Sequence, residues 1–105
     1  MQIQINTDKN ISGHEALAQS VKDVLMSVLS RFSDQITRIE VHLSDDNSAA
    51  NSGITDKRCL LEVRLAGQQP IAVSEQAQTV EQAVTGAAHK MVNLLETNLG
   101  KRGKR

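Results

Sequence analysis

Residues 58–65 read RCLLEVRL, and they give the clearest strand pattern of the sequence. Apolar and polar side chains alternate along it, so that one side carries Cys59, Leu61, Val63 and Leu65 and the other carries Arg58, Leu60, Glu62 and Arg64. A period of two residues is typical of a β-strand with one buried face. The stretch therefore predicts a strand in a sheet that is covered on one side only.

The segment before this strand predicts a partner strand. Its apolar side chains, Ile39, Val41 and Leu43, are separated by polar ones, and the pattern ends near Ser44. Between the two strands, residues 45–55 are rich in Asp, Asn, Ser and Ala and have no apolar period. We expect a mobile loop there.

The segment after the central strand predicts a turn and a further strand. Residues 67–70 form the turn, and Pro70 suits the first position of a strand, where a missing N–H costs least. Ile71 and Val73 then begin the strand. At the start of the chain, residues 1–6 alternate between Met or Ile and Gln or Asn, which predicts the first strand.

Two amphipathic segments predict helices. Ser12 and Glu15 have the spacing of a capping box, and an apolar face then recurs every three or four residues through about Arg31. Thr79 and Gln82 offer a second capping box. The apolar stripe that follows ends before Gly100, which we expect to be the C-cap of this helix.

The element order predicts an α+β fold, β-α-β-β-β-α, in the form of a two-layer sandwich. A helix between the first two strands favours a parallel pair, and the later short connections favour antiparallel neighbours. We expect a four-stranded mixed sheet with both helices on one face. The opposite face would be open and would carry Gln2, Gln4, Arg38, Glu40, His42, Arg58, Glu62 and Arg64.

Charge divides the chain into a body and a short tail. The 105 residues suffice for one domain, and twelve basic side chains balance twelve acidic ones. Residues 101–105 hold four of the cations, so the body, residues 1–100, has eight basic and twelve acidic groups. We expect a folded domain over 1–100 and a basic C-terminal tail over 101–105, which an anionic partner would meet first.

The composition excludes several classes of function. Phe32 is the only aromatic residue, which argues against stacking on unpaired bases. Cys59 is the only cysteine, so an internal disulfide and a cysteine zinc cluster are excluded, and we expect it to be a small buried hydrophobe. The chain shows no leader and no long apolar run, so we expect a cytoplasmic protein without membrane contact.

Several stretches resemble the family of hibernation promoting factor and ribosome-associated inhibitor A, also called protein Y or sigma-54 modulation proteins. They are the opening MQIQINTDKNI, EAL at residues 15–17, DQITRIEVHL at 34–43, KRCLLEVRLAG at 57–67 and PIAVSEQAQTVEQAVTGAAHKM at 70–91. The resemblance spans nearly the whole chain, and it implies a short form without the dimerising second domain. It also implies a protein that binds the small ribosomal subunit near the decoding centre and stops translation in stressed or stationary cells.

The chain departs from the family in its charges. Better-known members carry repeated Lys and Arg along both helices, whereas the first helix here offers only Lys22 and Arg31. The last helix keeps Lys90, followed by Asn93, Glu96, Thr97 and Asn98. Phosphate neutralisation supplies much of the affinity for RNA, so fewer cations predict weaker binding and a shallower salt dependence.

We therefore expect RNA contacts from the tail and the helices. The residues are Lys90, Lys101, Arg102, Lys104 and Arg105, together with Lys22 and Arg31. The alternative is that the tail only aids solubility. On the sheet, Arg38, Lys57, Arg58 and Arg64 could form a basic strip, or Glu40 and Glu62 could neutralise them.

No pattern indicates catalysis or a cofactor. His14, His42 and His89 fall on different predicted elements, so we expect no metal site. A nucleophile elbow, a phosphate-cradling glycine loop and an acid/base pair are missing from the sequence, so we expect no enzyme and no small-molecule substrate. The expected partner is the small ribosomal subunit and its RNA, bound by a monomer. The alternative is a protein-interaction module of the same fold without ribosome binding.

Overall fold

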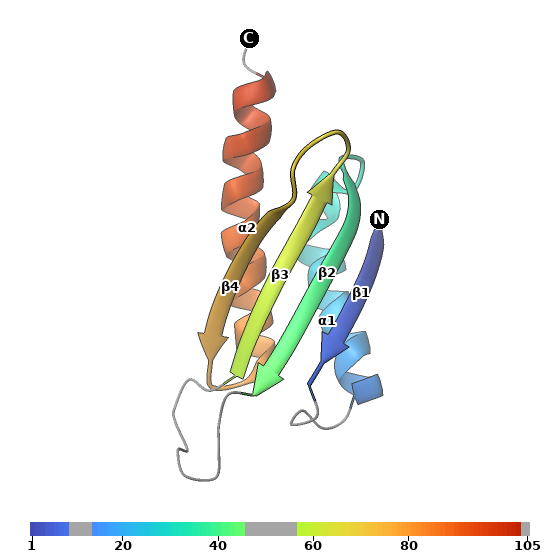
Figure 1. Ribbon diagram of the computed structural model, residues 1–105, viewed down its shortest axis with the longest axis vertical. Helices are drawn as coiled ribbons and strands as arrows, with labels where there is room; N and C mark the ends of the chain where they lie inside the picture. Colours follow the sequence, from blue (N-terminus) through green and yellow to red (C-terminus); the bar gives the residue numbers. More distant parts are fainter. Residues whose placement is uncertain (9–13, 46–56, 104–105) are drawn as a thin grey trace.

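The computed structural model describes residues 1–8, 14–45 and 57–103. Four strands and two α-helices follow one another in the predicted order, with one 3-10 turn between α1 and β2 (Figure 1). Their bounds are β1 Gln2–Thr7, α1 His14–Leu29, η1 Ser30–Phe32, β2 Ile36–Asp45, β3 Lys57–Leu65, β4 Ile71–Ala77 and α2 Val80–Gly103. Ser12 and all but the first residue of the expected 45–55 loop lie outside the described residues.

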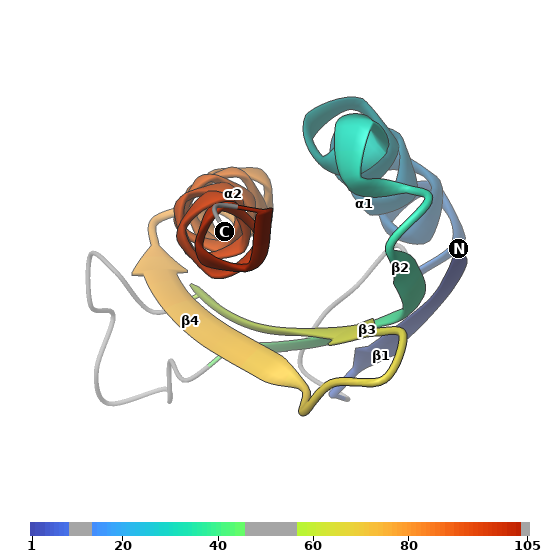
Figure 2. The same cartoon turned by 90° about the horizontal axis from the view of Figure 1, so that it is seen from above.

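The sheet has the order β1-β2-β3-β4. β1 pairs with β2 in parallel, and the two later pairs are antiparallel, as predicted from the connections. Both helices cover the same, concave face of the curved sheet, α1 toward β1 and β2 and α2 over β3 and β4 (Figure 2). The α+β sandwich is therefore confirmed.

The core lies between the helices and the sheet. The predicted burial of one side of β3 is confirmed, because Cys59, Leu61 and Val63 have no exposed surface. From the helices, Leu25 and Met91 are equally inaccessible. Small residues of α2, among them Ala87, are also buried, which allows this helix to lie close to the sheet.

Helix α2 begins where the sequence predicts and ends later than predicted. At α2, the Thr79 hydroxyl accepts a hydrogen bond from the Gln82 N–H at 3.1 Å, as expected of an N-cap. The expected end at Gly100 is wrong, because α2 continues through Gly103. A glycine ends a helix by adopting a left-handed conformation, and in the described part of the chain Gly67 alone has a positive φ.

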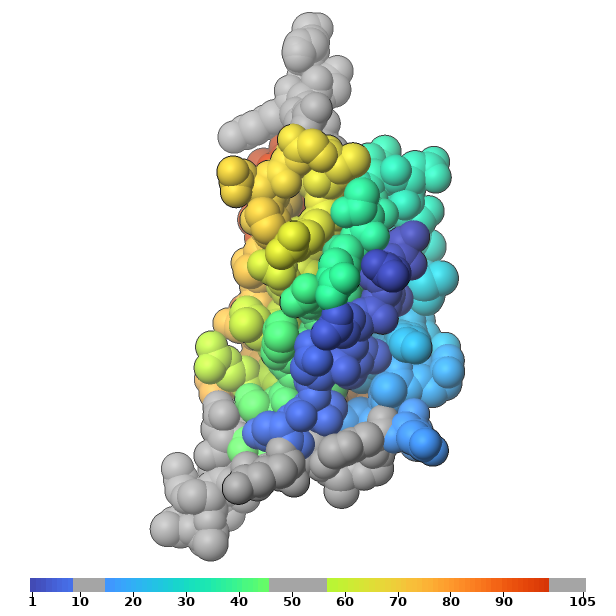
Figure 3. All heavy atoms as spheres, turned by 45° about the vertical axis from the view of Figure 1, so that its right-hand side comes forward, coloured from blue at the N-terminus to red at the C-terminus, as the bar shows by residue number. Residues whose placement is uncertain are grey.

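The other face of the sheet carries the polar set predicted for it. No helix covers it, and the strands β4 to β1 lie side by side across the surface in Figure 3. Its side chains form rows across the strands: Gln2, Arg38 and Arg64 in one, Gln4, Glu40 and Glu62 in the next, and Asn6, His42 and Leu60 in the third. Within the described ranges, no helix is long and apolar enough to cross a membrane.

Candidate nucleic-acid interface

Lys90 lies against the edge of the sheet. Its Nζ is 2.6 Å from Oε1 of Glu75 and donates a hydrogen bond of 2.9 Å to the carbonyl oxygen of Ser74. Both partners belong to β4, so the ammonium group joins α2 to this edge strand. In the protein alone, the charge of Lys90 is therefore already compensated by the Glu75 carboxylate.

This contact depends on a glycine in α2. Glu75 follows Ile71 and Val73 on the side of β4 that faces the helices, and it is paired in register with Cys59. A Cβ on Gly86 would lie 2.8 Å from Cγ of Glu75, and its three nearest atoms all belong to that side chain. The missing side chain therefore gives Glu75 room to reach Lys90 one helical turn further on.

Arg31 joins η1 to α2. Its guanidinium forms an ion pair with Glu96 and lies over the ring of Phe32, with 5.0 Å between Cζ and the ring centroid. Lys22, on the exposed side of α1, has no ion-pair partner within the described residues. The two predicted cations of the first helix region therefore differ, since only Lys22 is uncompensated.

The basic end of the chain is partly helical. Lys101 and Arg102 belong to the last turn of α2, which projects past the ends of the strands (Figure 1). Lys104 and Arg105 lie outside the described residues, and the division into a domain and a tail stays a prediction.

The cations of the open face fall into two kinds. Nε of Arg38 is 2.9 Å from Oε2 of Glu40, one of the two acids that the alternative named. Nζ of Lys57 is 3.5 Å from Oδ2 of Asp45, an acid that it did not name. Arg58 and Arg64 are exposed and have no ion-pair partner in the described part of the chain. The strip is therefore neither wholly neutralised nor continuous.

Two of the histidines are exposed, and the cysteine is buried. His42 is exposed and 3.5 Å from Oε1 of Glu40, and His89 is exposed on α2. Among the described residues, no three His, Cys, Asp or Glu side chains are grouped to hold a metal ion. Burial raises the pKa of the Cys59 thiol to about 12, so it is unreactive in the folded protein.

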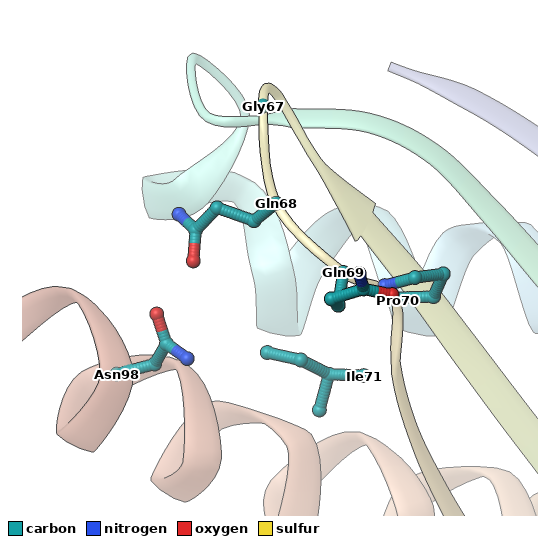
Figure 4. A pocket seen from close by; sticks show the side chains of 6 residues that line it. All are labelled: Gly67, Gln68, Gln69, Pro70, Ile71 and Asn98. Carbon is teal, nitrogen blue, oxygen red and sulfur yellow. The ribbon is translucent and has the colours of Figure 1, made fainter.

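A shallow hollow opens between the β3–β4 turn and α2. Its lining consists of Gly67, Gln68, Gln69, Pro70, Ile71 and Asn98, and the amides of Gln68 and Asn98 point toward each other across it (Figure 4). None of the lining side chains is ionisable. The hollow thus offers amide hydrogen bonds and no group for acid or base catalysis.

Sequence reasoning named Glu40 as an acid that could neutralise Arg38, but it missed the other acidic partners of these cations. Glu75 had a visible signal, because it places a carboxylate on the apolar side of an alternating strand, and such a group needs a partner. Glu96 had no such signal in the sequence, since its partner Arg31 is 65 residues away. Gly86 also had none, because only the packing of α2 on β4 shows what its missing side chain admits.

The fold is a small α+β sandwich, and the cations among its described side chains occupy separate positions. Residues 3–102 match the family described as Sigma 54 modulation protein / S30EA ribosomal protein. The chain belongs to this family, whose members are ribosome-associated proteins of hibernation and translation regulation.

Two solved structures share the fold. A ribosomal subunit interface protein from Coxiella burnetii superimposes with a TM-score of 0.73 at 18% identity, covering 95% of this chain and 99% of that one. The N-terminal domain of Thermus thermophilus Protein Y has a TM-score of 0.71 at 19% identity, covering 92% and 98%. No curated protein matches the sequence.

Proposed function

We propose that this chain is a non-catalytic inhibitor of translation that binds the small ribosomal subunit near the decoding centre under stress or in stationary phase. The family match over residues 3–102 is the observation that carries the proposal. A protein in this position would occupy space needed by messenger and transfer RNA. It would act in the cytoplasm and would be monomeric when free.

The charges of the chain suit such a role with modest affinity. Of the cations predicted to contact RNA, Lys90 and Arg31 already have carboxylate partners. Binding must then depend on other cations, such as Lys22, for which the described residues offer no carboxylate partner. With few phosphate contacts, the affinity should fall less steeply with salt than that of a strongly basic protein.

Sedimentation tests the proposal. Lysate from stationary-phase cells is centrifuged through a sucrose gradient at low salt, and the protein is detected in each fraction. We expect it with small subunits or whole ribosomes, and to dissociate as salt is raised. If the protein stays in the ribosome-free fractions even at low salt, the proposal is wrong.

A second candidate function is a protein-interaction module of the same fold. One observation favours it: Arg31, Arg38, Lys57 and Lys90 are each paired with a carboxylate, which leaves them less able to neutralise phosphates. Affinity purification at physiological salt separates the two. A stoichiometric protein partner without ribosomal protein or RNA would support the module, and co-purified small subunits would contradict it.

A further inference from the structure

The hollow between the β3–β4 turn and α2 has one wall that the fold holds in place. The Gln68 N–H donates a hydrogen bond of 3.2 Å to the Leu65 carbonyl oxygen, and Gly67, at the third position of this turn, has a φ of 72°. Glycine adopts such a φ without strain. The Ala66 N–H donates a further bond of 3.1 Å to the Gln35 carbonyl oxygen, which ties the turn to the segment before β2. This wall is therefore formed before any ligand arrives.

The opposite wall belongs to α2. Asn98 is half-buried there, and its amide points across the hollow toward the amide of Gln68 (Figure 4). Within the part of the chain that the structure describes, no hydrogen bond engages the side-chain amides of Gln68, Gln69 or Asn98. Each of these amides has N–H donors and a carbonyl acceptor. A ligand in the hollow would therefore meet donors and acceptors that the fold itself does not use.

The rest of the lining is apolar. Pro70 and the half-buried Ile71 supply hydrocarbon surface, and none of the lining side chains is charged. The hollow has a volume of about 690 Å³, within the range of about 300 to 1,000 Å³ common for sites of small ligands. A charged group would find no opposite charge among these side chains, and burying it would be costly. The ligand that fits is neutral, with apolar faces and hydrogen-bonding groups on its edge.

We propose that this hollow binds one unpaired base of ribosomal RNA, and adenine in preference to the others. A nucleobase is a neutral ring with apolar faces, and the amides of Asn and Gln pair with adenine through its N6 amino group and N7. Unpaired bases expose these edges to proteins. Phe32, the only aromatic side chain, is buried, so the base is held by its edge and by aliphatic contacts.

This inference rests on the proposed function and deepens it. Cations that neutralise phosphates supply affinity without regard to sequence. The hollow adds a neutral contact that reads a base, which fixes where on the RNA the protein comes to rest. A protein with few uncompensated cations gains more from such a contact than a strongly basic one.

Titration with free nucleosides tests the hollow without the ribosome. Adenosine or uridine is added to the isotope-labelled protein, and the side-chain amide signals are followed by NMR. We expect adenosine to shift the signals of Gln68 and Asn98 in a saturable way and to bind about ten-fold more tightly than uridine. Gln4 and Asn6 supply the control, because these amides lie outside the hollow and are bonded to each other at 3.3 Å. No saturable shift, or equal shifts at both amide pairs, would overturn the proposal.

Two asparagines of α2 supply a matched pair of variants. Asn98 lines the hollow, whereas Asn93 is exposed on the same helix and does not line it. Asn98→Ala and Asn93→Ala remove the same amide, and alanine favours the helix in both. Neither side chain makes a hydrogen bond within the described ranges, so neither change removes a contact on which folding depends.

Binding of both variants to purified small ribosomal subunits is measured at several salt concentrations. We expect Asn98→Ala to weaken binding about five- to ten-fold with an unchanged salt slope, because a neutral amide releases no counterions from phosphates, and Asn93→Ala to have no effect. Equal affinities of the two variants, or a lower salt slope in Asn98→Ala, would overturn the proposal. If the unaltered protein does not bind subunits, the proposed function fails, and the nucleoside titration still decides whether the hollow binds a base.

Cross-linking distinguishes RNA from a ribosomal protein as the occupant. Ala66 is exposed in the turn beside the hollow, and Cys59 is buried and unreactive. The thiol of Ala66→Cys can therefore be labelled selectively with a short photoactivated cross-linker. We expect the label to join ribosomal RNA at or next to an adenine. A cross-link to ribosomal protein alone would overturn the proposal.

Discussion

On one face of β3, Cys59, Leu61 and Val63 are wholly buried beneath the helices, while on the other Arg58, Leu60 and Arg64 meet solvent. Both sets alternate along the same nine residues, so they share one backbone and the same neighbouring strands. Whether a side chain of β3 packs in the core or meets solvent therefore depends on which face the helices cover, and not on the strand itself. Stability should depend on the covered face, and the open face should tolerate change.

The largest expected effect is the difference in stability between two variants, each with one leucine of β3 truncated, one on the covered face and one on the open face. Leu61 has no exposed surface, so Leu61→Ala should lower the free energy of unfolding by about 2 to 5 kcal/mol through lost burial and a cavity. Leu60, the preceding residue, is 37% exposed. Leu60→Ala should lower the free energy of unfolding by about 1 kcal/mol or less. Urea denaturation of both variants measures the difference, and similar losses would contradict the comparison.

The covered face should also make stability depend on alkaline pH. Burial raises the pKa of Cys59 from 9.0 to about 12, so the unfolded chain loses this proton first. The contribution is fully present below pH 9 and is lost as pH rises toward 12. At pH 10 the unaltered protein should have lost about 1 kcal/mol more of its free energy of unfolding than Cys59→Ala, relative to pH 7. Equal pH profiles would show that the thiol ionises equally in both states.

A smaller effect concerns the one carboxylate on the covered side of β4. In the presence of Glu75, Gly86→Ala gains helix propensity but displaces that side chain from Lys90. With Glu75→Ala already made, the same change should stabilise the protein by about 1 kcal/mol. A double-mutant cycle by thermal denaturation checks the coupling, and equal effects in both backgrounds would show that Gly86 is not needed for the contact.

The smallest effect should come from the open face. Glu40 and Glu62 are directly opposite each other across β2 and β3, and like charges so placed repel. Glu62→Gln should therefore raise the free energy of unfolding by about 0.2 to 1 kcal/mol. The gain should shrink in 1 M salt, where the repulsion is screened. A loss of stability would mean that Glu62 supports the fold.

Alternation and capping spacing were enough to predict the architecture. The apolar residues of β2 and β3 marked one face, and Thr79 marked the start of α2. β4 was predicted only from its first residues, because Glu75 interrupts the apolar side on which Ala77 continues. That interruption is tolerated only because Lys90, fifteen positions later in the chain, meets it.

The candidate site could be predicted less well. Residue types identify cations, but whether a cation is free depends on neighbours from other elements. Arg31 and Arg38 are compensated and Arg64 is not, and no local pattern separates them.

The bond between Lys90 and the Ser74 carbonyl has a consequence for association between copies of the chain. β4 is an edge strand, and unpaired edges can add strands from other molecules and aggregate. A charged ammonium held along such an edge makes the addition of a further strand unfavourable. Lys90, whose charge is compensated by Glu75, is thus placed to keep the protein from polymerising through its sheet.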